Sequence, residues 1–134
     1  IAAERIIALK PGDTTEVEGI PVEAVPAYNV GKKFHPQPNE WLGYVVTVGG
    51  ERCYVAGDTD ANPDVLQVSC DIAMIPVGGT YTTNPAEAAA WINAIRPAIA
   101  VPTHYGSIVG KKEDGDAFAR LVDEGIQVVK KLVF

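Results

Sequence analysis

The sequence has little of what marks several common classes of protein. Its 134 residues include two cysteines, two histidines and one methionine. Two cysteines are too few for the disulfide framework of a small secreted domain, so we expect Cys53 and Cys70 to be buried thiols in a reducing compartment. No uncharged apolar run approaches the roughly 18 residues of a membrane span. The first ten residues also lack the order of a signal peptide. We therefore predict a cytoplasmic protein without a membrane span.

Basic residues are in the minority. The chain has 11 Lys and Arg against 17 Asp and Glu, for a formal net charge of -6. The lysine pairs 32–33, 111–112 and 130–131 are short and scattered. Phosphate contacts need clustered cations, so we expect no nucleic-acid partner. With 47% hydrophobic and 21% charged residues, the composition indicates one ordinary globular domain.

Common catalytic motifs are also absent from the sequence. Ser69 and Ser107 lie in no Gly-x-Ser-x-Gly elbow, and residues 78–80 (GGT) are not followed by the Gly-Lys-Ser/Thr of a phosphate loop. The glycines form no dinucleotide fingerprint. Cys53 and Cys70 lack the close spacing of a redox pair. These absences disfavour serine hydrolases, P-loop proteins, dinucleotide enzymes and thiol redox proteins.

The first half of the chain is rich in β-like runs. Residues 27–41 (AYNVGKKFHPQPNEW) form a polar loop that is long for an idle connection, and such loops are often functional. We predict strands at 5–9, 44–48 and 51–56, and a hairpin within 17–25 that turns at residues 18–19. Gly49-Gly50 predicts a second hairpin between 44–48 and 51–56.

The second half alternates strands and helices. Asn84, Pro85 and Glu87 predict a helix start with a capping box, and Pro97 ends that helix. We further predict strands at 72–77, 98–102 and 127–133 and a helix at 114–124, with Phe118, Leu121 and Val122 facing inward. This alternation implies parallel βαβ units, whereas the upstream hairpins imply antiparallel pairing. The expected fold class is therefore α/β (α+β), a mixed sheet with helices on one face.

Residues 57–60 (GDTD) directly follow a predicted strand. The glycine allows a sharp turn, and Asp58 then projects from the carboxyl end of the strand, where open α/β sheets bind ligands. A carboxylate there can bind a divalent cation. The alternative is a simple turn, because Gly and Asp are common turn formers.

Both histidines fall at a strand end or in a loop. His104 lies in residues 103–106 (THYG) after a predicted strand, and neutral imidazole is a common metal ligand. Its alternative role is to bond a backbone carbonyl at the edge of the core. His35 lies in the long loop, where a histidine is usually just solvated. The strands that precede Asp58 and His104 could neighbour each other, with strand 72–77 as the third, which would bring the two side chains together.

Four segments resemble, in this order, the C-terminal half of a metallo-β-lactamase-fold hydrolase of the lactonase-like and phospholipase-D-like branch. They are AYNVGKKFHP, GYVVTVGGERCYVAGDTD, DIAMIPVGGTYTTNPAEAA and PAIAVPTHYG. The resemblance covers nearly the whole chain, and the combination of motifs is specific. It implies half of an αββα sandwich with a one- or two-metal site between its two sheets.

The resemblance also implies roles for single residues. Asp58 matches the carboxylate that bridges the metals, and His104 matches the last histidine ligand. Asn29 aligns with the family's third histidine position, but asparagine is a poor zinc ligand, so His35 is the preferred third ligand. Tyr105, or a lysine from 32–33, could steady negative charge in the reaction. Tyr105 could equally pack beside His104, and the lysines could be solvated.

The family's leading motif, His-x-His-x-Asp-His, is not in this sequence. Two histidines cannot complete a dinuclear site, in which each tetrahedral ion takes about four ligands. The chain also begins at Ile1 rather than at a methionine. We therefore expect residues 1–134 to be a single partial domain, with the N-terminal half upstream, in a separate chain, or lost. Alone, the chain should expose a large apolar patch or associate with a second chain, including a copy of itself.

The resemblance implies a metal-dependent hydrolase in which metal-bound hydroxide attacks an ester, lactone, amide or phosphoester bond of a small molecule. Zinc is the expected metal, with manganese and iron as alternatives, because a mixed His and carboxylate site accepts several ions. The rival hypothesis is a non-catalytic remnant that acts as a binding or assembly module. Metal content of the complete gene product separates the two hypotheses.

Overall fold

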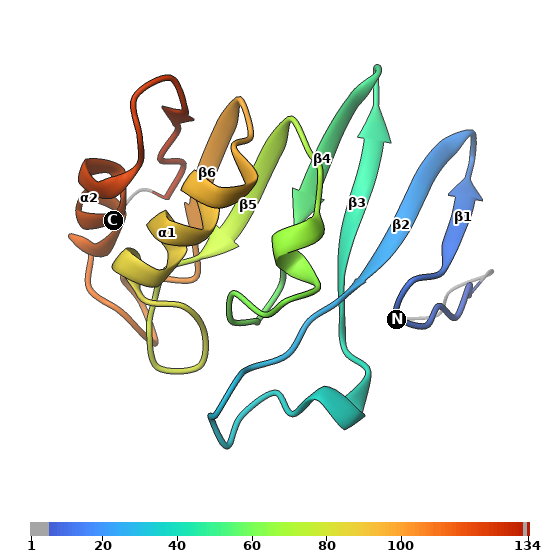
Figure 1. Ribbon diagram of the computed structural model, residues 1–134, viewed down its shortest axis with the longest axis horizontal. Coiled ribbons are helices and arrows are strands. Elements are labelled where there is room, and N and C mark those ends of the chain that lie inside the picture. The colour runs from blue at the N-terminus through green and yellow to red at the C-terminus, as the bar shows by residue number, and fades with distance from the viewer. Residues whose placement is uncertain (1–5, 133) are drawn as a thin grey trace.

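The computed structural model describes residues 6–132 and 134. They form one seven-stranded sheet whose spatial order, β1-β2-β3-β4-β5-β6-β7, follows the order of the chain (Figure 1). The strands are β1 (Thr14–Val17), β2 (Ile20–Pro26), β3 (Leu42–Val48), β4 (Glu51–Val55), β5 (Ile72–Pro76), β6 (Ile99–Thr103) and β7 (Gln127–Val128). The helices are α1 (Pro85–Ile95) and α2 (Asp114–Leu121), with short 3₁₀ turns η1 (Gln37–Asn39) and η2 (Val65–Gln67).

The sheet is mixed, as the sequence predicts. Strands β1 to β4 pair antiparallel through two hairpins, and β4 to β7 pair parallel. Parallel strands end at the same edge of a sheet. The loops after β2, β4, β5 and β6 consequently lie together at one end of the sheet, the lower end in Figure 1. The candidate residues of the sequence analysis are all in these loops.

Helix α1 forms where the sequence predicts it. The Asn84 side chain accepts hydrogen bonds from the backbone N–H groups of Ala86 and Glu87, and the Glu87 carboxylate accepts one from the Asn84 N–H. This capping box satisfies N–H groups that have no partner within the helix. Trp91 of α1 and Phe118 of α2 are both buried in the core.

The core lies on the face of the sheet that the two helices cover. Tyr54, Ala73 and Ala100 are in register on β4, β5 and β6, and all three are fully buried. The ring of Tyr54 packs edge-on against Trp91, with 6.0 Å between ring centroids. Helices on one face were predicted from the sequence, and this packing confirms them. Among the described residues, neither helix has the length and hydrophobicity to cross a membrane.

The opposite face of the sheet is apolar and has no helix over it within the described residues. Tyr44, Val55, Met74 and Val101 are in register across β3 to β6, so their side chains share this face. A second registered row consists of Val22, Val46, Cys53, Ile72 and Ile99. Tyr44 and Val55 are 38% and 42% exposed. The other members of the two rows are half-buried, except Val101, which is buried. This surface is called here the open apolar face.

Three local predictions are wrong. Residues 6–9 of the predicted strand 5–9 are irregular, and residue 5 lies outside the described residues; Ile6 is 82% exposed. The predicted helix 114–124 stops at Leu121, whose side chain is half exposed rather than inward. The last strand covers residues 127–128 rather than 127–133, of which residue 133 is outside the described part. All three lie at the ends of the sheet or chain, where few neighbours enforce regular structure.

Candidate functional site

Asp58 lies between the two histidines of the chain. Its Oδ2 atom is 3.4 Å from Nε2 of His35, and its Oδ1 atom is 3.4 Å from Nε2 of His104. The three side chains are 41%, 17% and 32% exposed, so the cluster is open to solvent at the sheet edge. The three candidate metal ligands of the sequence analysis therefore come together in space. We call this group the Asp58 cluster.

Backbone geometry places two members of the Asp58 cluster. Gly57, with φ of +68°, turns the chain sharply at the end of β4 and so presents Asp58. His104 follows β6 directly and itself has φ of +55°. A left-handed conformation is uncommon for a residue with a Cβ, and such conformations gather at functional sites. Across from it, a Cβ on Gly78 would lie 2.1 Å from the His104 carbonyl oxygen, so only glycine fits there.

The long loop between β2 and β3 carries the third member. His35 also has a left-handed φ, of +51°, and its carbonyl accepts a hydrogen bond from the Asn29 N–H. The His35 ring packs edge-on against Trp41 at 5.0 Å between centroids. These contacts close the loop on itself and aim the imidazole at Asp58.

Asn29 stands beside His35 rather than in its place. Its Nδ2 atom donates to the Tyr81 carbonyl at 2.7 Å and lies 3.4 Å from Nδ1 of His35. Its Oδ1 atom is buried without a hydrogen-bond partner among the described residues. Asn29 thus lies beside Nδ1 of the His35 ring, whereas Nε2 of the same ring faces Asp58.

The remaining residues of the GDTD motif hold the histidine loop. Asp60 accepts hydrogen bonds from the Val30 N–H at 3.0 Å and from the Lys32 ammonium at 2.5 Å. Lys32 also donates to the Thr82 carbonyl at 2.8 Å. Thr59 is fully buried and exchanges hydrogen bonds with the backbone of Tyr28. The sequence analysis gave Thr59 and Asp60 no role, although two acidic residues two positions apart after a strand were a visible signal.

The hydrogen bonds from the Lys32 ammonium to the Asp60 carboxylate and the Thr82 carbonyl are called here the clasp. Lys32 is therefore engaged in structural contacts. Its neighbour Lys33 is exposed, as the solvated alternative expects. Tyr105 is buried in the core, and a Cβ on Gly115 would lie 2.3 Å from the Tyr105 hydroxyl oxygen. Burial raises the pKa of this hydroxyl. The position of Tyr105 corresponds to the packing alternative of the sequence analysis.

The donor types of the Asp58 cluster suit a divalent cation. Two imidazole nitrogens and a carboxylate are the ligands that zinc, manganese and iron accept. Within residues 6–132 and 134, however, no group of three or more His, Cys, Asp or Glu side chains could hold a metal ion by itself. His104 Nδ1 is also buried with no hydrogen-bond partner in the described part of the chain. Within the described residues, the Asp58 cluster is therefore not a closed metal site.

The two cysteines are far from this chemistry. Cys53 and Cys70 are half-buried, rather than buried as the sequence predicts, and form no disulfide. Burial raises the pKa of the Cys70 thiol to about 11, with a smaller contribution from the Asp71 carboxylate. A thiol of that kind is a poor nucleophile at neutral pH. The geometry agrees with the rejection of thiol redox chemistry.

The seven-stranded mixed sheet with helices on one face, and with the Asp58 cluster in the loops at its edge, has the architecture of the metallo-β-lactamase fold. The family model described as Beta-lactamase superfamily domain matches residues 2–105. That range contains the Asp58 cluster and the residues described around it, namely Asn29, Lys32, His35, Asp58, Thr59, Asp60 and His104. The chain belongs to the β-lactamase superfamily domain family.

Curated relatives are similar over most of this chain. A protein of Thermococcus onnurineus named UPF0173 metal-dependent hydrolase is 32% identical over 120 residues, which are 86% of this chain and 54% of the relative. A protein of the same family name from Methanopyrus kandleri is 31% identical over 90% of this chain and 56% of its own length. The chain thus spans about half the length of the curated relatives it matches.

Solved structures agree on the fold. A candidate metal-dependent hydrolase from Parabacteroides distasonis superimposes with a TM-score of 0.78 and 38% identity, over 92% of this chain and 56% of the other. The diiron β-hydroxylase CmlA from Streptomyces venezuelae has a TM-score of 0.74 at 13% identity, over 94% of this chain and 33% of the other. The second likeness shows the fold alone, and a shared fold does not by itself fix the reaction.

Proposed function

We propose that this chain supplies the C-terminal ligands of a metal-dependent hydrolase. The observation that carries the proposal is the position of Asp58, with an imidazole nitrogen 3.4 Å from each of its carboxylate oxygens. The family to which the chain belongs and the names of its relatives support the same activity. Asp58, His35 and His104 are the proposed ligands, and the rest of the complete protein provides the others.

Each residue has a distinct part in this proposal. When bound, a divalent cation lowers the pKa of a coordinated water toward neutrality and so provides a nucleophile. Asp58 can orient a water molecule by accepting its hydrogen bond, and His35 and His104 fix the direction of the carboxylate. Asp60 and Lys32 keep the His35 loop in place, so they position the cluster without touching substrate.

The identity of the metal and the bond that is cleaved are two separate predictions. Zinc is the expected ion because two imidazoles and a carboxylate form a common catalytic donor set for it. Manganese and iron are the alternatives. The expected substrate is a small molecule with an ester, lactone, amide or phosphoester bond, each of which has a centre that an activated water can attack.

The open apolar face supports the view that the chain is half of a larger unit. Its two registered rows hold nine apolar or thiol side chains without one charge. Tyr44 and Val55 in these rows are more than a third exposed, and clustered apolar surface of this kind is normally covered by another element. We propose that a second sheet covers it, either from the same polypeptide or from a second chain, including another copy. The unpaired cysteines support a reducing, cytoplasmic location.

The experiment is metal analysis of the complete gene product. Purified wild-type protein should carry about one or two equivalents of metal, and a chelator should abolish its hydrolase activity. Asp58→Asn should lower the metal content, whereas Asp123→Asn, at an exposed ion pair with Arg96, should not. Wild-type protein that binds no zinc, manganese or iron would overturn the proposal.

The rival proposal is a non-catalytic binding or assembly module. One observation favours it, namely that the described residues alone hold no complete group of metal ligands. This module should show the same thermal stability with and without chelator and no hydrolysis of any ester or phosphoester. Either metal in the purified protein or chelator-sensitive hydrolysis excludes it.

A further inference from the structure

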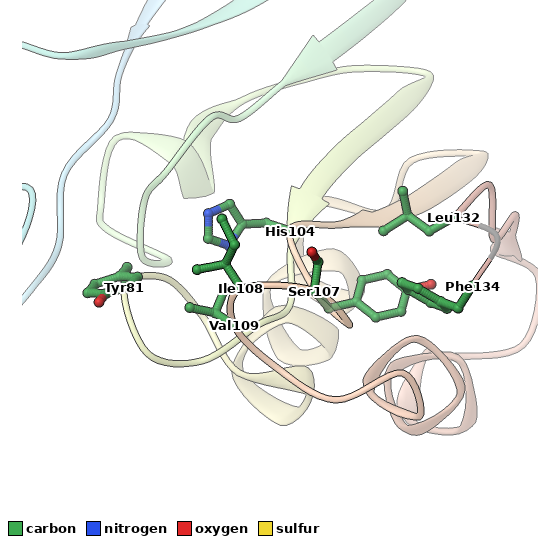
Figure 2. Close-up of a pocket in the computed structure, with 8 residues that line it drawn as sticks. Tyr81, His104, Ser107, Ile108, Val109, Leu132 and Phe134 are labelled. Carbon is green, nitrogen blue, oxygen red and sulfur yellow. The ribbon is translucent and has the colours of Figure 1, made fainter.

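A pocket of about 360 Å³ opens beside His104, on the side of the Asp58 cluster formed by the last part of the chain. Figure 2 shows Tyr81 on one side of this pocket and Leu132 and Phe134 on the other. Ile108 and Val109, from the loop after β6, complete its apolar wall. Its volume is at the lower end of the range for small-molecule sites.

The lining of this pocket is almost free of charge. Apart from His104, the lining residues with a polar group in their side chain are Tyr81, Tyr105 and Ser107, and no Asp, Glu, Lys or Arg is among the described residues that line it. The Lys112 ammonium lies 5.4 Å from the centroid of the Phe134 ring but does not line the pocket. A charged group that entered would lose water without gaining a partner, which is costly.

Several of the lining side chains are unusually exposed for their type. Ile108 is 96% exposed and Phe134 is 53% exposed. Exposed apolar side chains that gather around one concavity mark a binding site, whereas single ones are ordinary. An apolar ligand would remove these side chains from water.

The imidazole of His104 belongs to both the pocket and the Asp58 cluster. A substrate whose scissile bond lies at the Asp58 cluster therefore has its neighbouring substituent directed into the pocket. We propose that this pocket binds an uncharged, apolar substituent of the substrate, and that the preferred substrates are carboxylic esters, lactones or amides with a short aliphatic or aromatic group. This inference rests on the proposed hydrolase function.

The first test uses p-nitrophenyl acetate, butyrate and hexanoate with the complete, metal-loaded protein. Burial of each added methylene should raise kcat/KM about fourfold until the pocket is full. Ile108→Glu should abolish this gain, Ile108→Leu should retain it, and Leu66→Glu, at an exposed site on η2 outside the pocket, should leave it unchanged. Equal kcat/KM for all three esters in the wild type, or hydrolysis of p-nitrophenyl phosphate with ester hydrolysis absent, would overturn the inference.

A second test separates the pocket from the reaction. Calorimetric titration of the metal-free complete protein with 4-phenylbutanamide, a neutral apolar amide, should detect binding that Ile108→Glu weakens at least tenfold and Leu66→Glu does not. Binding of this amide without any hydrolase activity would reject the proposed function but keep the apolar site. Hydrolysis without such binding, or with binding equal in Ile108→Glu, would reject the apolar site and keep the function.

Discussion

No side chain fits between Gly78 and the backbone of His104. A Cβ on Gly78 would lie 2.1 Å from the His104 carbonyl oxygen and 3.1 Å from Cγ2 of Val109. Gly78 follows β5, and His104 follows β6, so two adjacent strand ends are in backbone contact. This contact fixes the position of the His104 backbone, and with it the imidazole, relative to the end of β5.

Gly78→Ala should therefore displace His104 and weaken the Asp58 cluster. We expect metal affinity to fall by about 10- to 100-fold, as for other residues that orient a metal ligand. The measurement is a zinc competition titration of the complete protein. Gly125→Ala is the matched control, because Gly125 has φ of +92° with nothing within 4 Å, so it should lose about 1–2 kcal/mol of stability and no metal affinity. Equal affinities in the wild type and Gly78→Ala would contradict the positioning role.

Lys32→Met should loosen the loop that carries His35. The ammonium of Lys32 bonds Asp60 and the Thr82 carbonyl, and its removal leaves a largely buried carboxylate short of a partner. Hydrogen bonds to charged groups contribute about 1.5–3 kcal/mol, so we expect a loss of that order in the free energy of unfolding. Chemical denaturation measures it. Lys33→Met, next to it but exposed, should change stability by less than about 0.5 kcal/mol. If the two variants are equally stable, the clasp contributes nothing.

The Cys70 thiol should react slowly with alkylating agents. Burial raises its pKa to about 11, and the thiolate is the reactive species. In a Cys53→Ser variant, the logarithm of the rate with iodoacetamide should rise with a slope near one from pH 7 to pH 9.5. A free thiol, with a pKa of about 8.5, would level off within this range. A plateau below pH 9 would show that Cys70 is more accessible than its position implies.

The pair of Glu23 and Arg52 should make stability depend on pH. The Arg52 guanidinium, by hydrogen bonding, holds the pKa of the Glu23 carboxyl below its usual value. Because the folded-state pKa is depressed, the contribution is complete above the usual pKa of glutamate and disappears as the pH falls through the folded value. Both side chains are more than a third exposed, so the effect should be at most about 1 kcal/mol. Glu23→Gln should be less stable than the wild type at pH 7 and equal to it near pH 2, as measured by urea denaturation.

The sequence predicted the sheet well where local signals and long-range packing agree. The Gly49-Gly50 hairpin and the capping box at Asn84 each rest on a few neighbouring residues, and both are in the structure. The alternation of strands and helices from residue 72 onward was enough to indicate the parallel half. The predicted strand at residues 6–9 is absent from the structure, because a strand-like composition alone does not supply a neighbouring strand to pair with.

The residues of the candidate site also differ in how far the sequence alone could predict their positions. Asp58 and His104 could be brought together from topology, because their strands flank β5. His35 could be chosen only by the resemblance, since the loop of residues 27–41 has no periodicity that fixes its path. The two acidic residues after β4 were a visible signal for Asp60, but its pairing with Lys32 was not predictable, because a contact between two irregular loops leaves no pattern in either segment.

The strand order has a consequence for how the chain acquires its structure. Every strand lies beside the one that precedes it in the sequence, so each new strand can pair with a strand that has already been synthesised. During synthesis the sheet can then extend one strand at a time from the ribosome, without waiting for a later segment to insert between earlier ones.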